Sequence, residues 1–290
     1  MSQESVPTIL LPEVDDPAIA ALREADQNEH IGEKMGVNLY FPEEPMSLGD
    51  AAIELNKDNG VNIVIAGASH GSPDVLRMAI RDVGAPNKFI SSFFIMEKEG
   101  EEPMFFADCA VHDKPKPHEL VKIAEQTSRS VQQLGYEPVV AFLSLSTFGS
   151  ADHLPGVQQI QQAAAEFKEQ HPEIISYGEL QVDAAIDPSI FKKKSKGGAE
   201  LIDGKLPNVF IFPDGQSGNI SYKFLEQKAG YAAIGPILDG VARDVHDLSR
   251  GVTLESLIRS CEVAGQLFIA RQKAQAEKPK VATEAAAETV

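Results

Sequence analysis

Residues 208–240 read NVFIFPDGQSGNISYKFLEQKAGYAAIGPILDG, and this stretch decides the fold class. Residues 208–212 form an apolar run that stops at Pro213, which is typical of a buried strand. A loop of small residues follows, then a helical stretch over 219–229 and a second apolar run over 232–238. The order strand, helix, strand predicts a helix packed against a sheet.

The same alternation continues outward from this stretch. Further apolar runs predict strands at 61–68, 89–96, 103–111 and 139–144, with a charged hairpin turn over 97–102. Helical spacing predicts a helix beginning near Pro73 and helices over 118–134, 157–170 and 253–270. The chain is therefore predicted to be an α/β protein with a mostly parallel sheet covered on both faces. In such sheets ligands bind beyond the carboxyl ends of the strands.

The two ends of the chain differ from this pattern. Residues 1–50 carry five prolines and only one clear helical stretch, over 17–25. Residues 271–290 consist mainly of Ala, Glu and Lys, which cannot bury enough apolar surface to order themselves. We expect this C-terminal segment to be mobile.

Charge and composition exclude several function classes. The chain has 26 Lys and Arg against 43 Asp and Glu, a net charge of −17, which argues against a general nucleic-acid binder. A local cationic pocket for a small anion remains compatible with this charge. The longest apolar runs fall far short of the ~20 residues that span a membrane, and no secretory signal is visible. The cysteines, Cys109 and Cys261, match no zinc spacing and fit a reducing cytoplasm.

Two loops are candidate anion sites. The loop at 213–219 places backbone N–H groups at the positive end of a helix, and Lys223 adds a cation one turn later. Farther on, Ser249, Arg250 and Gly251 combine a hydroxyl, a forked guanidinium and an approachable backbone, which suits a phosphoryl group. Taken alone, each has an ordinary alternative: a Gly-rich turn for the first and a surface arginine for the second.

Taken together, these motifs resemble a known family. PDGQSGNISYK (213–223), AIGPILDG (233–240) and DLSRG (247–251) are similar to the C-terminal signature of the phosphate acetyltransferase/phosphate butyryltransferase family. Upstream motifs fall in the order of the same family: GASH (67–70), DVLR (74–77), SSFFIM (91–96), FADCA (106–110), LSLST (143–147) and GELQ (178–181). The resemblance covers roughly residues 50–273.

The resemblance implies a fold and an activity. It implies two α/β domains with parallel sheets, the active-site cleft between them, and usually a homodimer. The domains would comprise 1–87 with 242–273, and 88–241, leaving a flexible tail at 274–290. The reaction would be reversible transfer of an acetyl or short acyl group between coenzyme A and phosphate. Coenzyme A would be a substrate, with no permanently bound cofactor, no metal and no nucleic-acid or membrane partner.

The resemblance also assigns roles to residues. Ser249 and Arg250 match positions that hold the phosphoryl or acyl end of the substrate, and Arg77 matches an arginine of the same cleft. A dianionic acyl phosphate needs such cations and donors near the approaching thiol. The residues that match the substrate-binding loop and helix are Ser217, Gly218, Asn219, Tyr222 and Lys223.

Three departures from the family affect this assignment. Position 256 is Ser where the family commonly has an Asp proposed as the base, and serine cannot take a thiol proton near neutral pH. Asp247, His246 and Glu255 are the alternative bases, although Glu255 lies one helical step, about 100°, away from Ser256. Phe148 replaces a common lysine, and the region before residue 50 is short and lacks an arginine associated with coenzyme A.

Three functions therefore remain open. The first is an active phosphate acyltransferase, and the second is a non-catalytic or weakly active regulatory paralogue that binds coenzyme A or acyl phosphate. The third is an unrelated anion-binding or scaffold role.

Three other features have a structural alternative beside a functional one. His70 is either a catalytic acid or a histidine of the cleft wall. The lysines at 192–194 and Lys196 either attract the phosphates of coenzyme A or, the reading we favour, form a solvated loop. We interpret Glu179 and Asp183 as structural or interface groups.

Overall fold

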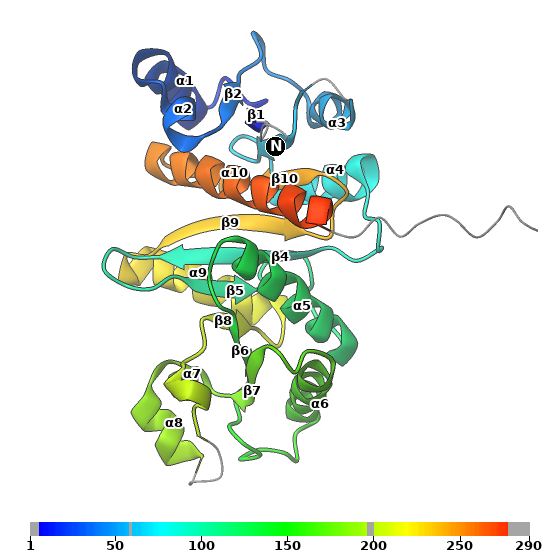
Figure 1. Ribbon diagram of the computed structural model, residues 1–290, viewed down its shortest axis with the longest axis vertical. Helices are drawn as coiled ribbons and strands as arrows, with labels where there is room; N and C mark the ends of the chain where they lie inside the picture. The colour runs from blue at the N-terminus through cyan, green and yellow to red at the C-terminus, as the bar shows by residue number, and fades with distance from the viewer. Residues whose placement is uncertain (1–5, 58–59, 196–199, 278–290) are drawn as a thin grey trace, which may run out of the picture.

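The computed structural model describes residues 6–57, 60–195 and 200–277. Its strands are β1 (Thr8–Leu10), β2 (Asn38–Tyr40), β3 (Ile63–Ala66), β4 (Ser91–Glu97), β5 (Met104–Ala107), β6 (Val139–Leu143), β7 (Ile175–Leu180), β8 (Val209–Ile211), β9 (Ala232–Asp239) and β10 (Asp244–Asp247). Its α-helices are α1 (Pro17–Glu29), α2 (Ile31–Met35), α3 (Leu48–Asn56), α4 (Ser72–Met78), α5 (Pro117–Gln133), α6 (Pro155–Gln170), α7 (Val182–Ile186), α8 (Pro188–Lys194), α9 (Gly215–Ala229) and α10 (Leu254–Glu277). Strands and helices alternate along most of the chain (Figure 1).

These strands pair into one ten-stranded sheet in the order β2-β1-β3-β10-β9-β4-β5-β8-β6-β7. Four parallel strands, β2, β1, β3 and β10, form one end of the sheet. Another parallel set, β5, β8, β6 and β7, forms the other end. The long strands β9 and β4 join the two sets through antiparallel pairs. Figure 1 shows the two sets above and below β9 and β4.

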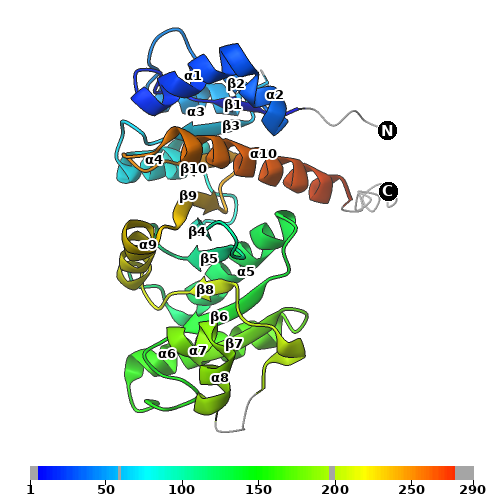
Figure 2. The same ribbon diagram turned by 90° about the vertical axis from the view of Figure 1, so that its left-hand side faces the viewer.

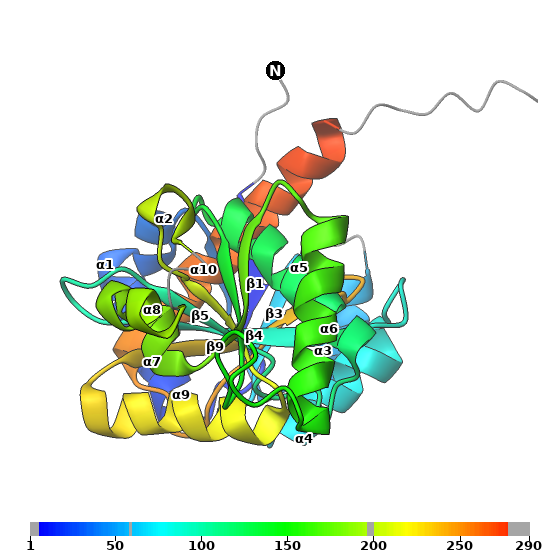
Figure 3. The same cartoon turned by 90° about the horizontal axis from the view of Figure 1, so that it is seen from below.

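Helices cover both faces of this sheet. On one face α1, α2 and α10 pack on the first set, and α5 and α6 pack with α10 on the second. On the opposite face α3 and α4 pack on the first set, and α7, α8 and α9 pack on the second. Seen from below, α9 lies on the other side of the strands from α10 (Figure 3). Each strand side chain therefore faces one of two apolar layers, which explains the nearly continuous apolar runs.

The C-terminal helix α10 contacts both sets of strands. Its residues Cys261 and Phe268 lie in the core of the first set, whereas Val263 and Leu267 lie in the core of the second. Arg271 on the same helix pairs with Asp239 at the end of β9, at 2.8 Å, and with Asp244 at the start of β10. Figure 2 shows α10 running beside the sheet between the two sets.

The α/β class and the mostly parallel sheet are confirmed, and so is the β4–β5 hairpin. The N-terminal region holds more regular structure than expected, because β1, α2, β2 and α3 accompany α1. The helix α10 continues to Glu277, so residues 274–277 belong to a helix and not to a tail, while 278–290 lie outside the described residues. The division into two domains stays a prediction. Within the described ranges, no helix combines the length and apolarity that crossing a membrane requires.

Candidate functional site

The carboxyl ends of β3 and β10 lie side by side, because the strands pair in parallel with Ala66 opposite Asp247. The amide of Leu248 donates a hydrogen bond to the carbonyl of Ala66 at 2.8 Å. The loop after β3 packs closely on this turn: a Cβ at Gly67 would lie 2.8 Å from the backbone nitrogen of Leu248, and φ of Gly67 is +116°. Glycine is therefore required here. As a result, the loop of His70 and the loop of Arg250 leave the same sheet edge together.

Ser249 and Arg250 occupy the exposed turn between β10 and α10. The carbonyl of Ser249 accepts a hydrogen bond from the amide of Val252 at 3.0 Å, which fixes the turn. Among the described residues, the Arg250 guanidinium has no hydrogen-bond or ion-pair partner. A forked cation is thus open to solvent at a strand end, where it suits a phosphoryl oxygen.

A buried carboxylate organises the neighbouring loop. Glu13, which follows β1, is only 2% exposed. It accepts hydrogen bonds from four consecutive backbone amides, those of Gly67 and Ala68 at 2.7 and 2.9 Å and those of Ser69 and His70 at 3.1 and 2.9 Å. Its Oε1 also lies 2.5 Å from Nδ1 of His70. Glu13 therefore fills an anion-binding nest of backbone amides and holds the His70 ring at the same time.

Two further titratable groups lie at the end of β10. Burial lowers the pKa of His246 to about 3, so this ring is neutral at physiological pH. Burial also raises the pKa of Asp247 to about 7, and the charge of Glu13 acts in the same direction. Neither carboxylate oxygen of Asp247 accepts a hydrogen bond of normal geometry from the described residues. The nearby Ser72 hydroxyl and Leu248 amide act to lower this pKa, but they offset only part of the rise that burial causes.

Arg77 lies on α4, the helix that follows the His70 loop. Val75 and Met78 turn into the core, whereas Arg77 is exposed and pairs with Asp74 at 2.6 Å. The Arg77 and Asp74 side chains are 64% and 52% exposed, so this ion pair is weak and exchangeable with a ligand. Figure 2 places α4 and α9 on the same side of the sheet, above and below β9.

The start of α9 corrects the expectation of a loop with free amides. The helix begins at Gly215, and the Asp214 carboxylate caps it by accepting the amide of Ser217 at 2.8 Å. The Ser217 hydroxyl donates to the carbonyl of Asp214 at 2.9 Å, and the amide of Gly218 donates to the same carbonyl at 3.2 Å. The chain's own oxygens therefore already hold two of the expected donor amides, those of Ser217 and Gly218.

The rest of this motif packs α9 against the loop after β5. A Cβ at Gly218 would lie 2.7 Å from the carbonyl oxygen of Asp108, and Asn219 Nδ2 donates to the carbonyl of Cys109 at 3.2 Å. Tyr222 is buried and stacks on Phe94 with 4.0 Å between ring centroids. Lys223 is exposed, and its Nζ lies 4.9 Å from the centroid of the Tyr222 ring. Of the motif's side chains, Asn219 and Lys223 stay accessible to a ligand.

The structure does not bring all of the predicted site residues together. Strand register places the end of β10 beside the second half of β9, because His246 pairs with Ile237, and the antiparallel pairing directs the chain after β10 toward the start of β9 and the end of β4. The start of α9 lies beyond the opposite end of β4 and β9, near the end of β5. No hydrogen bond or ion pair in the described ranges joins residues 217–219 to Arg77 or Arg250.

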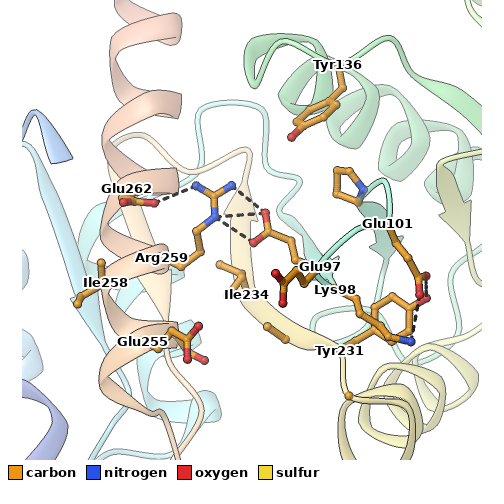
Figure 4. A pocket seen from close by; sticks show the side chains of 15 residues that line it. Glu97, Lys98, Glu101, Tyr136, Tyr231, Ile234, Glu255, Ile258, Arg259 and Glu262 are labelled. Carbon is orange, nitrogen blue, oxygen red and sulfur yellow. Dashed lines mark hydrogen bonds and ion pairs between the residues drawn. The ribbon is translucent and has the colours of Figure 1, made fainter. Parts of the chain in front are cut away.

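The larger cavity, about 800 Å³, lies between α10 and the β4–β5 hairpin (Figure 4). Arg259 on α10 crosses its wall and binds Glu97 through Nε and Nη2 at 3.0 and 2.8 Å, and Glu262 at 3.0 Å. The rim is acidic, and its lining residues include Ser256 and the alternative base Glu255. A second cavity of about 560 Å³ lies beyond the ends of β5 and β8, beside Lys114, Lys116 and Asp214.

Other residues singled out from the sequence have structural roles. Burial raises the pKa of the Cys109 thiol well above its ordinary value and that of Cys261 to about 12. Glu179 is buried and accepts hydrogen bonds from the Ser146 hydroxyl and the Gly149 amide at 2.7 and 2.8 Å. Asp183 pairs with Lys194 at 2.6 Å. Lys196 lies outside the described residues. Within the part of the chain that the structure describes, no group of three or more His, Cys, Asp or Glu side chains could hold a metal ion.

Sequence reasoning missed Glu13 and gave Asp247 only as an alternative base. The one available signal for Glu13 was the LPE segment at 11–13, whose glutamate sits between apolar and proline residues. Nothing in the sequence indicates that this carboxylate reaches a loop more than fifty positions later, because the parallel pairing of β1 with β3 creates that proximity.

Comparison with known proteins places these features in a family. The family model "Phosphate acetyl/butaryl transferase" matches residues 43–264. A phosphate acetyltransferase of Mycoplasma pneumoniae is 37% identical over 235 residues, covering 80% of this chain and 71% of that protein. One of Thermoanaerobacterium thermosaccharolyticum is 41% identical over 210 residues, covering 70% of this chain and 63% of that protein. The chain thus spans about two thirds of the curated relatives that it matches.

A solved structure agrees with this match over more of the chain. The phosphotransacetylase of Staphylococcus aureus superposes with a TM-score of 0.71 at 28% identity. The superposition covers 90% of this chain and 94% of that protein, so it extends beyond the part of the chain that the family model matches.

Proposed function

Because the chain belongs to the phosphate acetyl/butaryl transferase family, we propose that it transfers an acetyl or other short acyl group between coenzyme A and phosphate. The reaction is acetyl-CoA + phosphate = CoA + acetyl phosphate. The observation that carries the proposal is the exposed Arg250 beside Ser249 at the end of β10, which has no partner among the described residues, in a chain of net charge −17. An unpaired cation at a strand end of so acidic a protein suits a dianionic substrate.

In this proposal the acyl phosphate binds at the shared edge of β3 and β10. Arg250 takes two phosphoryl oxygens with its forked guanidinium, and the Ser249 hydroxyl donates to a third oxygen or to the carbonyl. Arg77 exchanges Asp74 for the substrate. Coenzyme A extends from this edge toward the start of α9, where Asn219 and Lys223 contact it. The sulfur attacks the carbonyl carbon while phosphate leaves, so both ends of the reaction carry charge that these donors stabilise.

The test is acylation of coenzyme A by the purified protein with acetyl, propionyl and butyryl phosphate, run beside a coenzyme A binding titration. We expect turnover with at least one acyl phosphate, and kcat/KM about 10²-fold or more lower in Arg250→Ala. Arg81→Ala is the matched control, because Arg81 is exposed and pairs only with its neighbour Asp82. Full activity in Arg250→Ala would show that the substrate binds elsewhere.

A second candidate is a regulatory paralogue that binds coenzyme A or acyl phosphate with little or no turnover. The observation that favours it is Ser256, whose hydroxyl accepts a hydrogen bond from Thr253 Oγ1 at 3.1 Å within the first turn of α10. A serine held this way supplies no base. Tight binding of coenzyme A without any acylation, in the same titration and assay, would favour this candidate.

We also propose a homodimer and a cytoplasmic location. Leu145, Val182 and Ile186 are 64%, 56% and 53% exposed, and Phe148 is 37% exposed, all near the end of β7. Hydrogen bonds between Thr147 and Gln181 bring their loops together, so these apolar side chains form one patch suited to a second copy. Sedimentation of the wild type and of Val182→Glu/Ile186→Glu should give a dimer and a monomer. Two free, buried thiols support a reducing compartment.

A further inference from the structure

Acyl transfer from an acyl phosphate to coenzyme A requires a group that takes the thiol proton, and Ser256 cannot do so. A thiol with a pKa of about 8.5 is mostly protonated at neutral pH, so a base increases the reactive thiolate. Glu255 is exposed on α10 and borders the cavity at the β4–β5 hairpin. His246 and Asp247 are 3% and 1% exposed, which leaves a substrate no access to them.

His70 has the geometry of an oriented base. Nδ1 of its ring lies 2.5 Å from Oε1 of Glu13, and that carboxylate also accepts the four backbone amides of the loop. A carboxylate surrounded by donors accepts a hydrogen bond from Nδ1–H, so the neutral ring presents an unprotonated Nε2. The Glu13 side chain is 2% exposed whereas the His70 side chain is 39% exposed. This pair, the Glu13–His70 dyad, therefore extends from the core to the surface.

The same dyad lies at the edge where the substrate-binding arginine emerges. Ala66 and Asp247 are opposite each other in register, His70 follows Ala66 by four residues, and Arg250 follows Asp247 by three. Neighbouring strands lie about 4.8 Å apart, so these two loops begin one strand spacing from each other. The close fit of Gly67 against Leu248 keeps them in contact.

We propose that His70, oriented by Glu13, is the general base of this protein, an inference that rests on the proposed acyltransferase function. Nε2 of His70 takes the proton of the coenzyme A thiol, and the sulfur electron pair forms the C–S bond to the acyl carbon. The C–O bond to phosphate breaks, and the leaving phosphate receives the proton from Nε2. Acyl phosphate and thiol thus give thioester and hydrogen phosphate, with His70 returned to its neutral form.

The experiment compares His70→Ala with wild type in the acylation assay, with and without added imidazole. We expect kcat to fall by roughly 10²–10⁴-fold while KM for the acyl phosphate changes little. Imidazole should restore part of the rate with saturation, because it occupies the space beside Glu13. His30→Asn is the matched control: His30 is an exposed histidine with φ +53°, a conformation that Asn tolerates, and its rate should equal that of wild type.

Glu13 acts through His70 and is a positioning residue. Glu13→Gln should lower kcat and leave KM for acyl phosphate nearly unchanged, whereas general loosening of the site would raise KM as well. His70→Asn serves as a second variant in case the alanine variant does not fold, because its amide still donates to Glu13 but takes no proton.

The outcomes separate this inference from the function on which it rests. A wild type that acylates coenzyme A with none of the acyl phosphates contradicts the proposed function itself. An active wild type with an equally active His70→Ala, or a slow but folded His70→Ala that imidazole does not accelerate, overturns the role of His70 alone.

Discussion

At residue 256 the sequence resemblance predicts a departure from the family, a serine in place of a common aspartate, and the position of this residue on α10 makes it easy to test. Ser256 lies in the first turn of α10, where its amide donates to Thr253 Oγ1 at 3.2 Å. A carboxylate is favourable at a helix N-terminus, so Ser256→Asp should fold normally. We expect kcat to rise roughly tenfold, less than the ~10²–10⁴-fold that a base contributes where none exists, because His70 already serves.

Ser256→Asn is the control for this substitution, because it has the same shape as Asp without the base. Steady-state kinetics with acetyl phosphate provides the measurement. A Ser256→Asp variant no faster than Ser256→Asn would mean that the position does not reach the thiol.

Asp247 makes the stability of the fold depend on pH. Its pKa is about 7 in the folded protein, mainly through burial, against an ordinary value of 3.8. An acid whose folded pKa is raised destabilises the fold when it ionises, so this cost is absent below about pH 4 and complete above about pH 7. Asp247→Asn removes the ionisation and should therefore stabilise the protein at pH 8, by on the order of 2 kcal/mol.

Urea denaturation at several pH values checks this expectation. The advantage of Asp247→Asn over wild type should shrink steadily from pH 8 to pH 4. An advantage that stays constant over this range would mean that another property of the asparagine, such as a new hydrogen bond, is responsible.

Among the elements, α9 depends on the close approach of Gly218 to the loop after β5. A Cβ at this position would meet the Asp108 carbonyl oxygen at 2.7 Å and the Cys109 sulfur at 2.9 Å. Because these are backbone and buried atoms, Gly218→Ala should lower the free energy of unfolding by about 1–3 kcal/mol. The control is Gly156→Ala on α6, where no atom lies within 4 Å of the added Cβ.

Urea denaturation of the two alanine variants gives the comparison. Gly156→Ala should be neutral or stabilising by up to about 1 kcal/mol, because alanine is the better helix former. Equal stability of the two variants would contradict the packing of α9 described above.

Helix α10 should owe part of its stability to Arg259. The two-pronged contact with Glu97 on β4 is partly buried, with the side chains 32% and 25% exposed. Arg259→Ala should therefore cost on the order of 1–2 kcal/mol in the free energy of unfolding. Arg129→Ala, which breaks an exposed pair with Glu125 on α5, should cost about 0.5 kcal/mol or less. A similar loss of unfolding free energy in both variants would mean that the Arg259 contact stabilises the protein no more than an ordinary surface ion pair.

At the scale of the whole molecule, the sequence predicts those strands and helices in which the buried residues are apolar. The apolar runs at β3, β4, β6 and β9 and the periodic helices α5 and α6 agree with the sequence prediction to within a few residues, whereas α10 begins where expected but continues seven residues beyond its predicted end. By contrast, β10 reads DVHD and escapes a pattern based on hydrophobicity, although all four of its residues are buried. Asp244 at its start is tolerated because Arg271 pairs with it, and His246 is tolerated because burial keeps its ring neutral.

In the candidate site, too, some residues could be predicted from the sequence and others could not. The local motif at 249–251 predicts Ser249 and Arg250, because a phosphoryl group needs a cation and donors that lie within a few residues of a turn, whereas Arg77 is predicted from the family resemblance alone. The Glu13–His70 dyad, however, depends on strand order, which brings the segment after β1 beside the loop after β3. Strand register also places the start of α9 and Arg250 toward opposite ends of β4 and β9. The spacing of the motifs along the sequence gives no indication of this separation.

The insertion of β10 between β3 and β9 has a consequence for synthesis of the chain. A ribosome releases residues in order, so β3 emerges well before its neighbour β10, which follows only after six further strands of the sheet. Until then one side of the first parallel set stays open, with unpaired backbone groups that attract foreign strands. Closing contacts this distant in sequence is slow. The nascent chain therefore exposes this strand edge until β10 has been made, and α10, which follows β10, then packs on both sets of strands at once.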